Sequence, residues 1–328
     1  MNEAEQFEEQ PYGWVIVAIA TLFMALGFGS NVTVPVLVKP FEEEFGWNRA
    51  AISMAYTALT IGAAAGGLFW GTLSDKIGAK RIVAFGVVML SGSLTLIGLQ
   101  DQLWMIYLLY FVIGGFGFAC MFTPLLALTG LWFNRRKGLA LGIVTAGGAI
   151  GQGVAPVVFQ MMISNSNWRD AIFYLGVGYF VVMLPTVFLL RQPPVLVNSS
   201  ETVSRSDANI WGLSHRITIP WLALAGIFCC ICMAVPIVHL VPLVVGLKQS
   251  PETAAGLLLT LMVSGTFGRV FFGAVADRIG ALYTYFVASL MQTVMVFWFT
   301  QSETLIVLHI IAAIFGFGFS GVMTSLLI

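Results

Sequence analysis

The sequence predicts an all-α membrane protein in which one multi-helix unit occurs twice. Three observations carry this prediction. Hydrophobic residues make up 59% of the 328 positions and charged residues 9%, whereas a soluble domain carries about 25% charged residues. Ten apolar stretches approach or exceed the roughly 20 residues that cross a bilayer. A short charged segment recurs at a fixed distance along the chain.

The recurring segment is a charged turn between apolar stretches, found at residues 71–81 and again at 273–280. Two glycines and an aspartate return 202 positions later, in the pairs Gly71 with Gly273, Asp75 with Asp277 and Gly78 with Gly280. Many secondary transporters are built from such internal repeats. We therefore expect two halves of related structure.

The first half, residues 1–190, contains six predicted spans. They cover residues 12–38, 49–73, 82–99, 104–128, 139–163 and 171–190. Gly27, Gly29 and Pro35 interrupt the first span, and such breaks occur where a membrane helix lines a cavity. A loop is expected at 39–47, and Asn48 is expected to cap the second span.

A polar stretch at 191–216 is predicted to be a linker between the halves. The second half, residues 217–328, has four predicted spans, at 217–245, 253–275, 282–300 and 305–328. Because the first half has six, the repeat predicts twelve spans in all. We interpret the sequence as truncated at its C-terminal end after ten of them, with a natural ten-span protein as the alternative.

Lys and Arg residues predict the orientation, because cytoplasmic loops carry an excess of both. Placing the N-terminus in the cytoplasm puts ten of these residues in cytoplasmic loops and four in the opposite loops. We therefore expect a multi-pass protein of an inner or plasma membrane with a cytoplasmic N-terminus. The acidic first residues differ from the basic start of a signal peptide.

Composition and motifs argue against several other classes. The formal net charge is zero, so no basic surface for nucleic acid is expected. The sequence contains no HExxH motif, phosphate-binding loop or paired carboxylates typical of an enzyme, and no cofactor is expected. Cys229, Cys230 and Cys232 lie in an apolar run and are interpreted as packing residues, with a metal site as the weaker alternative.

Arg269 is the strongest candidate for a substrate-binding residue. It precedes Asp277 by eight residues, which is ~12 Å along a helix. A charge at that depth is costly and by default indicates function, and a guanidinium fork can bind both oxygens of a carboxylate. No Asp, Glu or Lys lies deep in any predicted span, which favours an anionic substrate. The alternatives are snorkelling of the side chain to the cytoplasmic surface or a structural hydrogen bond to the carbonyls of a neighbouring helix, and helices beyond residue 328 could add a carboxylate.

Other polar residues in the spans are secondary candidates. His239 could titrate and couple transport to protons, or it could be a structural histidine. Asn31, Tyr56, Tyr110 and Gln152 are candidates for substrate binding, with helix–helix contacts as the alternative.

The repeated turns are candidates for conformational gating. An aspartate at the end of a membrane helix can bind the N-terminus of a neighbouring helix in one conformation and release it in another. The plain alternative is a solvated turn. The gating candidates are Gly71, Asp75, Gly78, Arg81, Gly273, Asp277, Arg278 and Gly280.

Residues 71–81 resemble the loop 2–3 signature of the major facilitator superfamily, and residues 273–280 resemble the equivalent loop 8–9. Three further stretches resemble the branch of monocarboxylate transporters and oxalate/formate antiporters. They are Tyr12-Gly13-Trp14, residues 132–142 and residues 239–242. The resemblance spans nearly the whole chain.

The resemblance implies two six-helix bundles that work by alternating access, with Arg269 at the position of an arginine that contacts the substrate carboxylate. Two departures affect the proton mechanism. Proton-coupled members have an aspartate where this chain has Gly265, and a lysine near Ser30 and Asn31. The second basic residue of the oxalate/formate type falls in a span beyond residue 328.

The sequence therefore predicts a secondary active transporter of small organic anions, either monocarboxylates or short dicarboxylates. Coupling to protons or to counter-exchange is open. A membrane sensor that kept the carrier fold but does not transport is the alternative. A channel is disfavoured, because glycine-rich repeats with one charge inside a span suit a gated carrier better.

Overall fold

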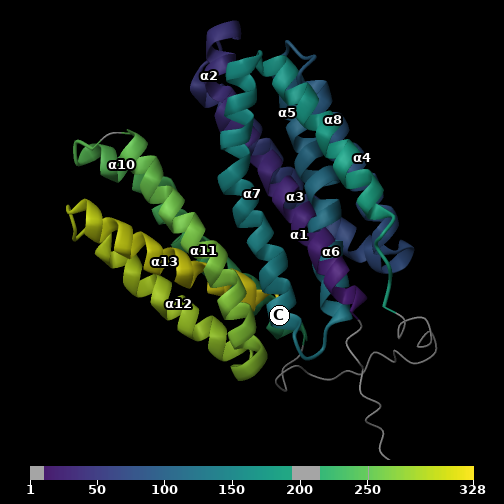
Figure 1. Cartoon of the computed structure of the whole chain (residues 1–328), viewed down its shortest axis with the longest axis vertical. Coiled ribbons are helices and arrows are strands. Elements are labelled where there is room, and N and C mark those ends of the chain that lie inside the picture. Colours follow the sequence, from purple (N-terminus) through teal and green to yellow (C-terminus); the bar gives the residue numbers. More distant parts are fainter. Residues whose placement is uncertain (1–10, 194–214, 250) are drawn as a thin grey trace, which may run out of the picture. The chain divides into compact units, whose positions relative to one another are not determined.

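All regular structure in the described residues is helical (Figure 1). The computed structural model describes residues 11–193, 215–249 and 251–328. The predicted linker therefore lies almost entirely outside the described residues, as do the first ten positions. The helices of the first part of the chain are α1 (Tyr12–Asn31), α2 (Thr33–Phe45), α3 (Arg49–Ile77), α4 (Ala79–Ile97), α5 (Leu103–Val112), the π-helical η1 (Ile113–Phe118), α6 (Ala119–Trp132), α7 (Lys137–Asn165) and α8 (Trp168–Val187). Those of the second part are α10 (His215–Gly246), α11 (Pro251–Ile279), α12 (Ala281–Trp298) and α13 (Leu305–Leu326).

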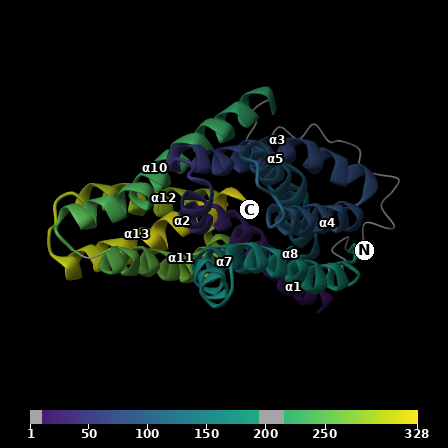
Figure 2. The ribbon, with the colours of Figure 1, turned by 90° about the horizontal axis from the view of Figure 1, so that it is seen from above.

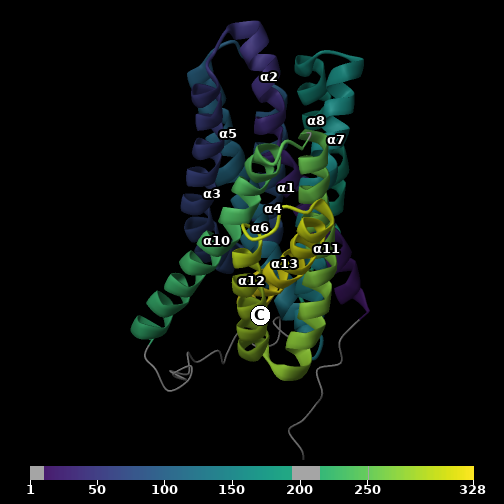
Figure 3. The same ribbon diagram turned by 90° about the vertical axis from the view of Figure 1, so that its left-hand side faces the viewer.

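The chain forms two compact units. The first comprises Met1–Arg135 and Ile143–Arg191, and the second comprises Arg136–Gly142 and Gln192–Ile328. In the first unit α3 runs alongside α5, as Figure 3 shows, and α4 packs against α8. In the second unit α13 packs against both α11 and α12 (Figure 2).

Within the described residues, nine helical stretches are long and apolar enough to cross a membrane. One combines α1 with α2, and another combines α5, η1 and α6. α10, at the seventh predicted span, contains the apolar stretch Ala223–Met233. The all-α membrane fold expected from composition is confirmed.

The backbone repeats with the offset of the sequence. Gly78 and Gly280 have φ of 88° and 87°, and each joins two successive helices. Gly46 and Lys248, which are also 202 positions apart, have φ of 68° and 61°. Lysine rarely adopts a positive φ. Its left-handed conformation here shows that the turn geometry is kept even where the glycine is not.

Close helix contacts repeat in the same register. A β-carbon at Gly66 would collide with the carbonyl oxygen of Gly115, and one at Gly268 would collide with that of Phe317. Both partners of each contact are again 202 positions apart. Small residues let helix backbones approach within a membrane, where association depends on packing. The duplication therefore preserves specific interhelical contacts as well as spans.

Two adjacent glycines of α3 provide a test of this packing. Gly66→Val is expected to destabilise the first unit by about 3 kcal/mol, because the new side chain meets backbone that cannot move aside. Gly67→Val is the matched control, since a β-carbon at Gly67 meets no atom within 4 Å. Thermal unfolding of both variants in detergent measures the difference. Equal midpoints would contradict the close packing of α3 against η1.

The predicted break in the first span is confirmed. α1 ends at Asn31 and α2 begins at Thr33, with Val32 outside helical geometry at φ −86° and ψ 2°. Pro35 lies in the first turn of α2, where its missing N–H leaves no hydrogen bond unmade. The Asn48 cap is also confirmed, because its side chain accepts a hydrogen bond of 2.7 Å from the Ala51 amide.

The predicted loop at 39–47 is wrong over most of its length. α2 continues to Phe45, and the non-helical segment is residues 46–48. Leu37 and Phe41 are buried one turn apart on one face of α2, while the glutamates of its last turns lie at the surface. Charged residues near a helix end resemble a loop in the sequence, but here one apolar face extends the helix beyond them.

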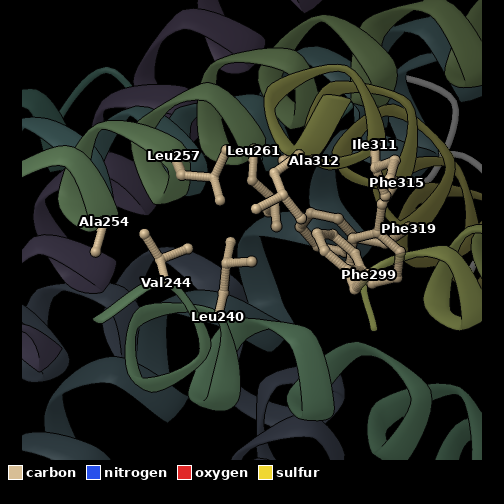
Figure 4. Packing of buried hydrophobic residues seen from close by; sticks show 11 residues of the cluster. Leu240, Val244, Ala254, Leu257, Leu261, Phe299, Ile311, Ala312, Phe315 and Phe319 are labelled. Carbon is tan, nitrogen blue, oxygen red and sulfur yellow. The ribbon is translucent and has the colours of Figure 1, made fainter. Parts of the chain in front are cut away.

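The second unit has a core where four helices meet. Leu240 and Val244 of α10 lie toward Leu257 of α11, as Figure 4 shows. On the other side the rings of Phe315 and Phe319 stack, with centroids 5.9 Å apart. This core fixes α11, which carries Arg269, against α13.

Side chains from three other helices bind the chain at and just beyond the end of α8. The Tyr12 hydroxyl donates to the Leu189 carbonyl at 2.6 Å, and the Trp132 indole donates to the Arg191 carbonyl at 3.1 Å. Lys80 donates to the Phe188 carbonyl at 2.9 Å. The stretches beginning at Tyr12 and Trp132, far apart in the sequence, thus meet at the point where the linker departs.

Candidate functional site

Arg269 is buried in the second unit. It lies on α11, and 9% of its surface is exposed. Asp277 follows two turns later and is exposed at the end of the same helix. The separation of ~12 Å along the helix axis places Arg269 well inside the apolar stretch Gly256–Ile279. A guanidinium is stable at such a depth only where polar groups or aromatic rings compensate for its loss of hydration.

An aromatic ring from α13 contributes to this environment. The guanidinium carbon of Arg269 lies 6.0 Å from the centroid of the Phe319 ring. The same ring approaches Gly265, one turn before Arg269, where a β-carbon would lie 3.3 Å from it. Ser320 is fully buried beside Gly265. Glycine at 265 thus leaves the space in which α13 places an aromatic ring beside the arginine.

The first turns of α7 pack against α11 within the second unit. A β-carbon at Gly142 would collide with the carbonyl oxygen of Arg269, and one at Gly138 would collide with that of Gly273. Residues 138 and 142 share one face of α7, as 269 and 273 share one face of α11. The glycines of the stretch 132–142 therefore allow backbone contact along the helix segment that carries Arg269.

Asp277 binds the N-terminus of α7. Its Oδ1 accepts from the Gly138 amide at 2.6 Å, and its Oδ2 accepts from the Leu139 amide at 2.8 Å. The first amides of a helix have no partner within the helix, and the helix dipole there favours negative charge. The carboxylate thus satisfies two such amides at once.

The two repeated turns share backbone geometry but differ in contacts. Both second glycines adopt positive φ, which explains why glycine occurs there. Asp75 is exposed, and among the described residues the structure shows no helix N-terminus bound by it. Arg81 and Arg278 are exposed beside their turns, and Gly71 is half-buried near Thr123. The gating role of these residues stays a prediction.

His239 lies in a different environment from Arg269. It lines an apolar pocket of about 430 Å³ between α10 and the end of α12. Its neighbours there are Pro236, Leu240, Leu243, Val296, Phe299 and Thr300. Arg269 is not among the described residues that line this pocket, so the structure does not bring His239 and Arg269 together there.

The candidates of the first unit lie near the break between α1 and α2 or on separate helices. The Tyr110 hydroxyl is fully buried and lies 3.0 Å from the Thr33 hydroxyl, just beyond the break. The Asn31 side-chain oxygen is buried and accepts no hydrogen bond from the described residues. Tyr56 on α3 is 47% exposed, and Gln152 on α7 is half-buried. Their binding roles stay predictions.

Among the described residues no group of His, Cys, Asp and Glu could hold a metal ion. Cys229 is buried beside Met233, and Cys230 is exposed.

The sequence did not identify Phe319 as part of the site, because it lies in an alternating Gly-Phe run that is typical of ordinary helix packing. The signal available was the offset, because residue 319 aligns with Gly117 in the glycine-rich part of the first half.

The sequence pattern of the Major Facilitator Superfamily matches residues 17–328. The chain belongs to this superfamily. The match covers nearly the whole chain and includes both repeated turns, so it supports the resemblance seen in residues 71–81 and 273–280.

Several proteins that are similar in sequence to this chain have names that describe them as transporters. Monocarboxylate transporter 13 of Rattus norvegicus is 28% identical over 277 residues, covering 82% of this chain and 62% of its own length. Monocarboxylate transporter 12-B of Danio rerio is 24% identical over 297 residues, covering 81% of this chain and 62% of its own length. MFS-type transporter 1 of Ophiocordyceps sp. (strain BCC 1869) is 24% identical, covering 96% of this chain and 70% of its own length. The chain thus spans about two thirds of the length of these relatives.

Solved structures of the superfamily share the fold. The proton:xylose symporter XylE has a TM-score of 0.73 at 14% identity, covering 96% of this chain and 81% of that structure. FucP in its outward conformation has a TM-score of 0.65 at 15% identity, covering 96% and 89%. Superfamily membership and these folds make the chain a multi-pass membrane protein of a transporter family rather than an enzyme.

Proposed function

We propose that this chain acts in secondary active transport of small organic anions, either monocarboxylates or short dicarboxylates, by alternating access. The observation that carries the proposal is Arg269, a buried guanidinium inside a membrane helix of a superfamily member. Relatives named monocarboxylate transporters support the substrate class. The proposal includes coupling of anion transport either to protons or to counter-exchange.

In this proposal Arg269 binds the substrate carboxylate. Guanidinium presents parallel N–H donors that match two carboxylate oxygens, and its charge interacts strongly where water is excluded. The ring of Phe319 lies beside the guanidinium and forms a cation–π contact with it. An anion that binds at Arg269 would also lower the cost of keeping the charge within the membrane.

Asp277 serves as a gate in the same proposal. Its two bonds to α7 stabilise one arrangement of α7 and α11 and are lost when those helices separate. Asp75 takes the corresponding role in the first copy of the turn. Both turns face the cytoplasm in the orientation that the Lys and Arg residues favour. His239, Asn31, Tyr56, Tyr110 and Gln152 remain secondary candidates for contacts with substrate or protons.

Ligand-induced thermal stabilisation of the purified protein tests the substrate class. Formate, acetate, oxalate and a 2-hydroxy acid are compared with their uncharged amides. A ligand at a hundred times its dissociation constant stabilises the folded state by about 2.7 kcal/mol. We expect some carboxylates to raise the unfolding midpoint while their amides do not. Equal effects of an acid and its amide, or no effect of any acid, would contradict the anionic substrate.

A further inference from the structure

The fourth membrane-spanning stretch of the first unit is not a uniform α-helix. Between α5 and α6, the six residues of η1 are π-helical, and the Ala119 amide donates to the carbonyl five residues earlier, at Gly114. π-helical segments are rare, occur mostly as single turns inside α-helices and are frequently found at functional sites. Neither Arg269 nor the gating turns account for this segment.

Neighbouring helices hold η1 by its glycines. A β-carbon at Gly114 would collide with the Leu59 carbonyl of α3, and one at Gly117 would lie 2.7 Å from the Leu90 β-carbon of α4. The backbone of η1 therefore lies directly against two helices. Its conformation depends on those helices as well as on its own sequence.

One side chain binds the η1 backbone directly. The indole N–H of Trp70, on α3, donates to the Gly115 carbonyl at 2.8 Å. The Trp70 ring also packs against Phe85 of α4 and Phe116 of η1, with centroids 5.4 Å and 5.8 Å apart. Trp70 thus connects the π-helical segment to α3 and α4, the two helices that pack against it.

The second unit provides an internal comparison. Phe272 and Phe317 occupy the positions that correspond to Trp70 and Gly115, and their rings lie 5.3 Å apart. Phenylalanine has no N–H to donate, and α13 is α-helical from Leu305 to Leu326. The indole bond and the π-helical segment therefore occur together in the first copy of the repeat, and the described residues at the corresponding positions of the second copy show neither.

We propose that η1 is a hinge of the first unit and that the Trp70 indole latches it in the π-helical form by binding the Gly115 carbonyl. A π-helical segment holds one residue more than the α-helix it interrupts. Its relaxation to α-helix therefore turns the residues that follow by about 100° relative to those before it. The hinge lets α6 rotate while α5 stays bound through the Tyr110 and Thr33 hydroxyls.

A native cysteine reports on this rotation. Cys120 lies in the first turn of α6 and is fully buried, with its β-carbon against Gly86 of α4. Rotation of α6 moves the thiol away from that contact. The rate at which a thiol reagent modifies Cys120 therefore measures how often the hinge opens.

The test compares Trp70→Phe with wild type by N-ethylmaleimide labelling, quantified at each cysteine by mass spectrometry. Phenylalanine keeps an aromatic ring and removes the N–H donor. We expect labelling of Cys120 to become roughly fivefold faster, as for the loss of one net hydrogen bond. Trp104→Phe is the matched control, because that indole donates to the exposed Gln102 side chain and lies away from η1.

Cys229 separates hinge opening from general loosening. It is buried in the second unit, where it contacts Met233. The proposal requires faster labelling of Cys120 in Trp70→Phe with unchanged labelling of Cys229. An unchanged rate at Cys120 would show that the indole is not a latch. Equal acceleration at both cysteines, or equal acceleration of Cys120 in Trp104→Phe, would likewise overturn the proposal.

Discussion

Arg269→Ala is expected to weaken carboxylate binding by a factor of roughly 10²–10³. Removing one partner of a buried, hydrogen-bonded charge pair costs about 3–4 kcal/mol, because the substrate carboxylate then lies in an environment that excludes water without its cation. Arg269→Lys keeps the charge but loses the planar fork, so an intermediate loss is expected. Isothermal titration with the carboxylate that stabilises the wild type most measures both variants.

Arg49→Ala is the control for this titration. Arg49 is also an arginine of a membrane helix, but its side chain is 74% exposed and pairs with Glu42 at 3.1 Å. Its removal is expected to leave carboxylate affinity within about twofold, as for most surface ion pairs. Wild-type affinity in Arg269→Ala would make Arg269 a structural residue and would remove the main support for an anionic substrate.

Asp277→Asn is expected to release the start of α7. The neutral amide keeps one oxygen but loses the charge that binds two helix amides, and hydrogen bonds to charged groups contribute about 1.5–3 kcal/mol each. Hydrogen exchange of the segment Arg136–Gly142, which contains both donating amides, should accelerate by roughly 10- to 100-fold. Mass spectrometry of peptides that cover this segment measures the change.

Asp75→Asn is the comparison in the same exchange experiment. It makes the same chemical change in the first copy of the repeated turn, where the described residues show no helix N-terminus bound by the carboxylate. Exchange of Arg136–Gly142 should stay at the wild-type rate in this variant. If Asp277→Asn also left that rate unchanged, the carboxylate would not be what holds α7 against α11.

The sequence predicted the features that recur or that depend on a single residue type. The offset between Gly78 and Gly280 predicted a duplicated turn, and both residues adopt the positive φ that favours glycine. Gly29 and Pro35 predicted the break that the structure places at Val32. Glycine and proline at such positions indicate the backbone conformation directly, because few other residue types adopt it.

The features that the sequence did not predict depend on contacts between distant residues. Gly114, Gly115 and Gly117 permit a π-helical segment but do not require one, and its form depends on Trp70 from another helix. Phe319 reads as ordinary apolar packing until α13 places its ring 6.0 Å from Arg269. The continuation of α2 to Phe45 depends on burial of Leu37 and Phe41, which charged neighbours obscure in the sequence.

Uptake of a radiolabelled carboxylate into proteoliposomes tests the central claim most directly. Purified wild-type protein and Arg269→Ala are reconstituted at equal density, and the vesicles are loaded either with unlabelled carboxylate or with buffer at a different pH. We predict saturable uptake by the wild type that depends on one of these two gradients and is lost in Arg269→Ala. Binding of the carboxylate without uptake under either gradient would contradict transport and would favour a membrane sensor with a carrier fold.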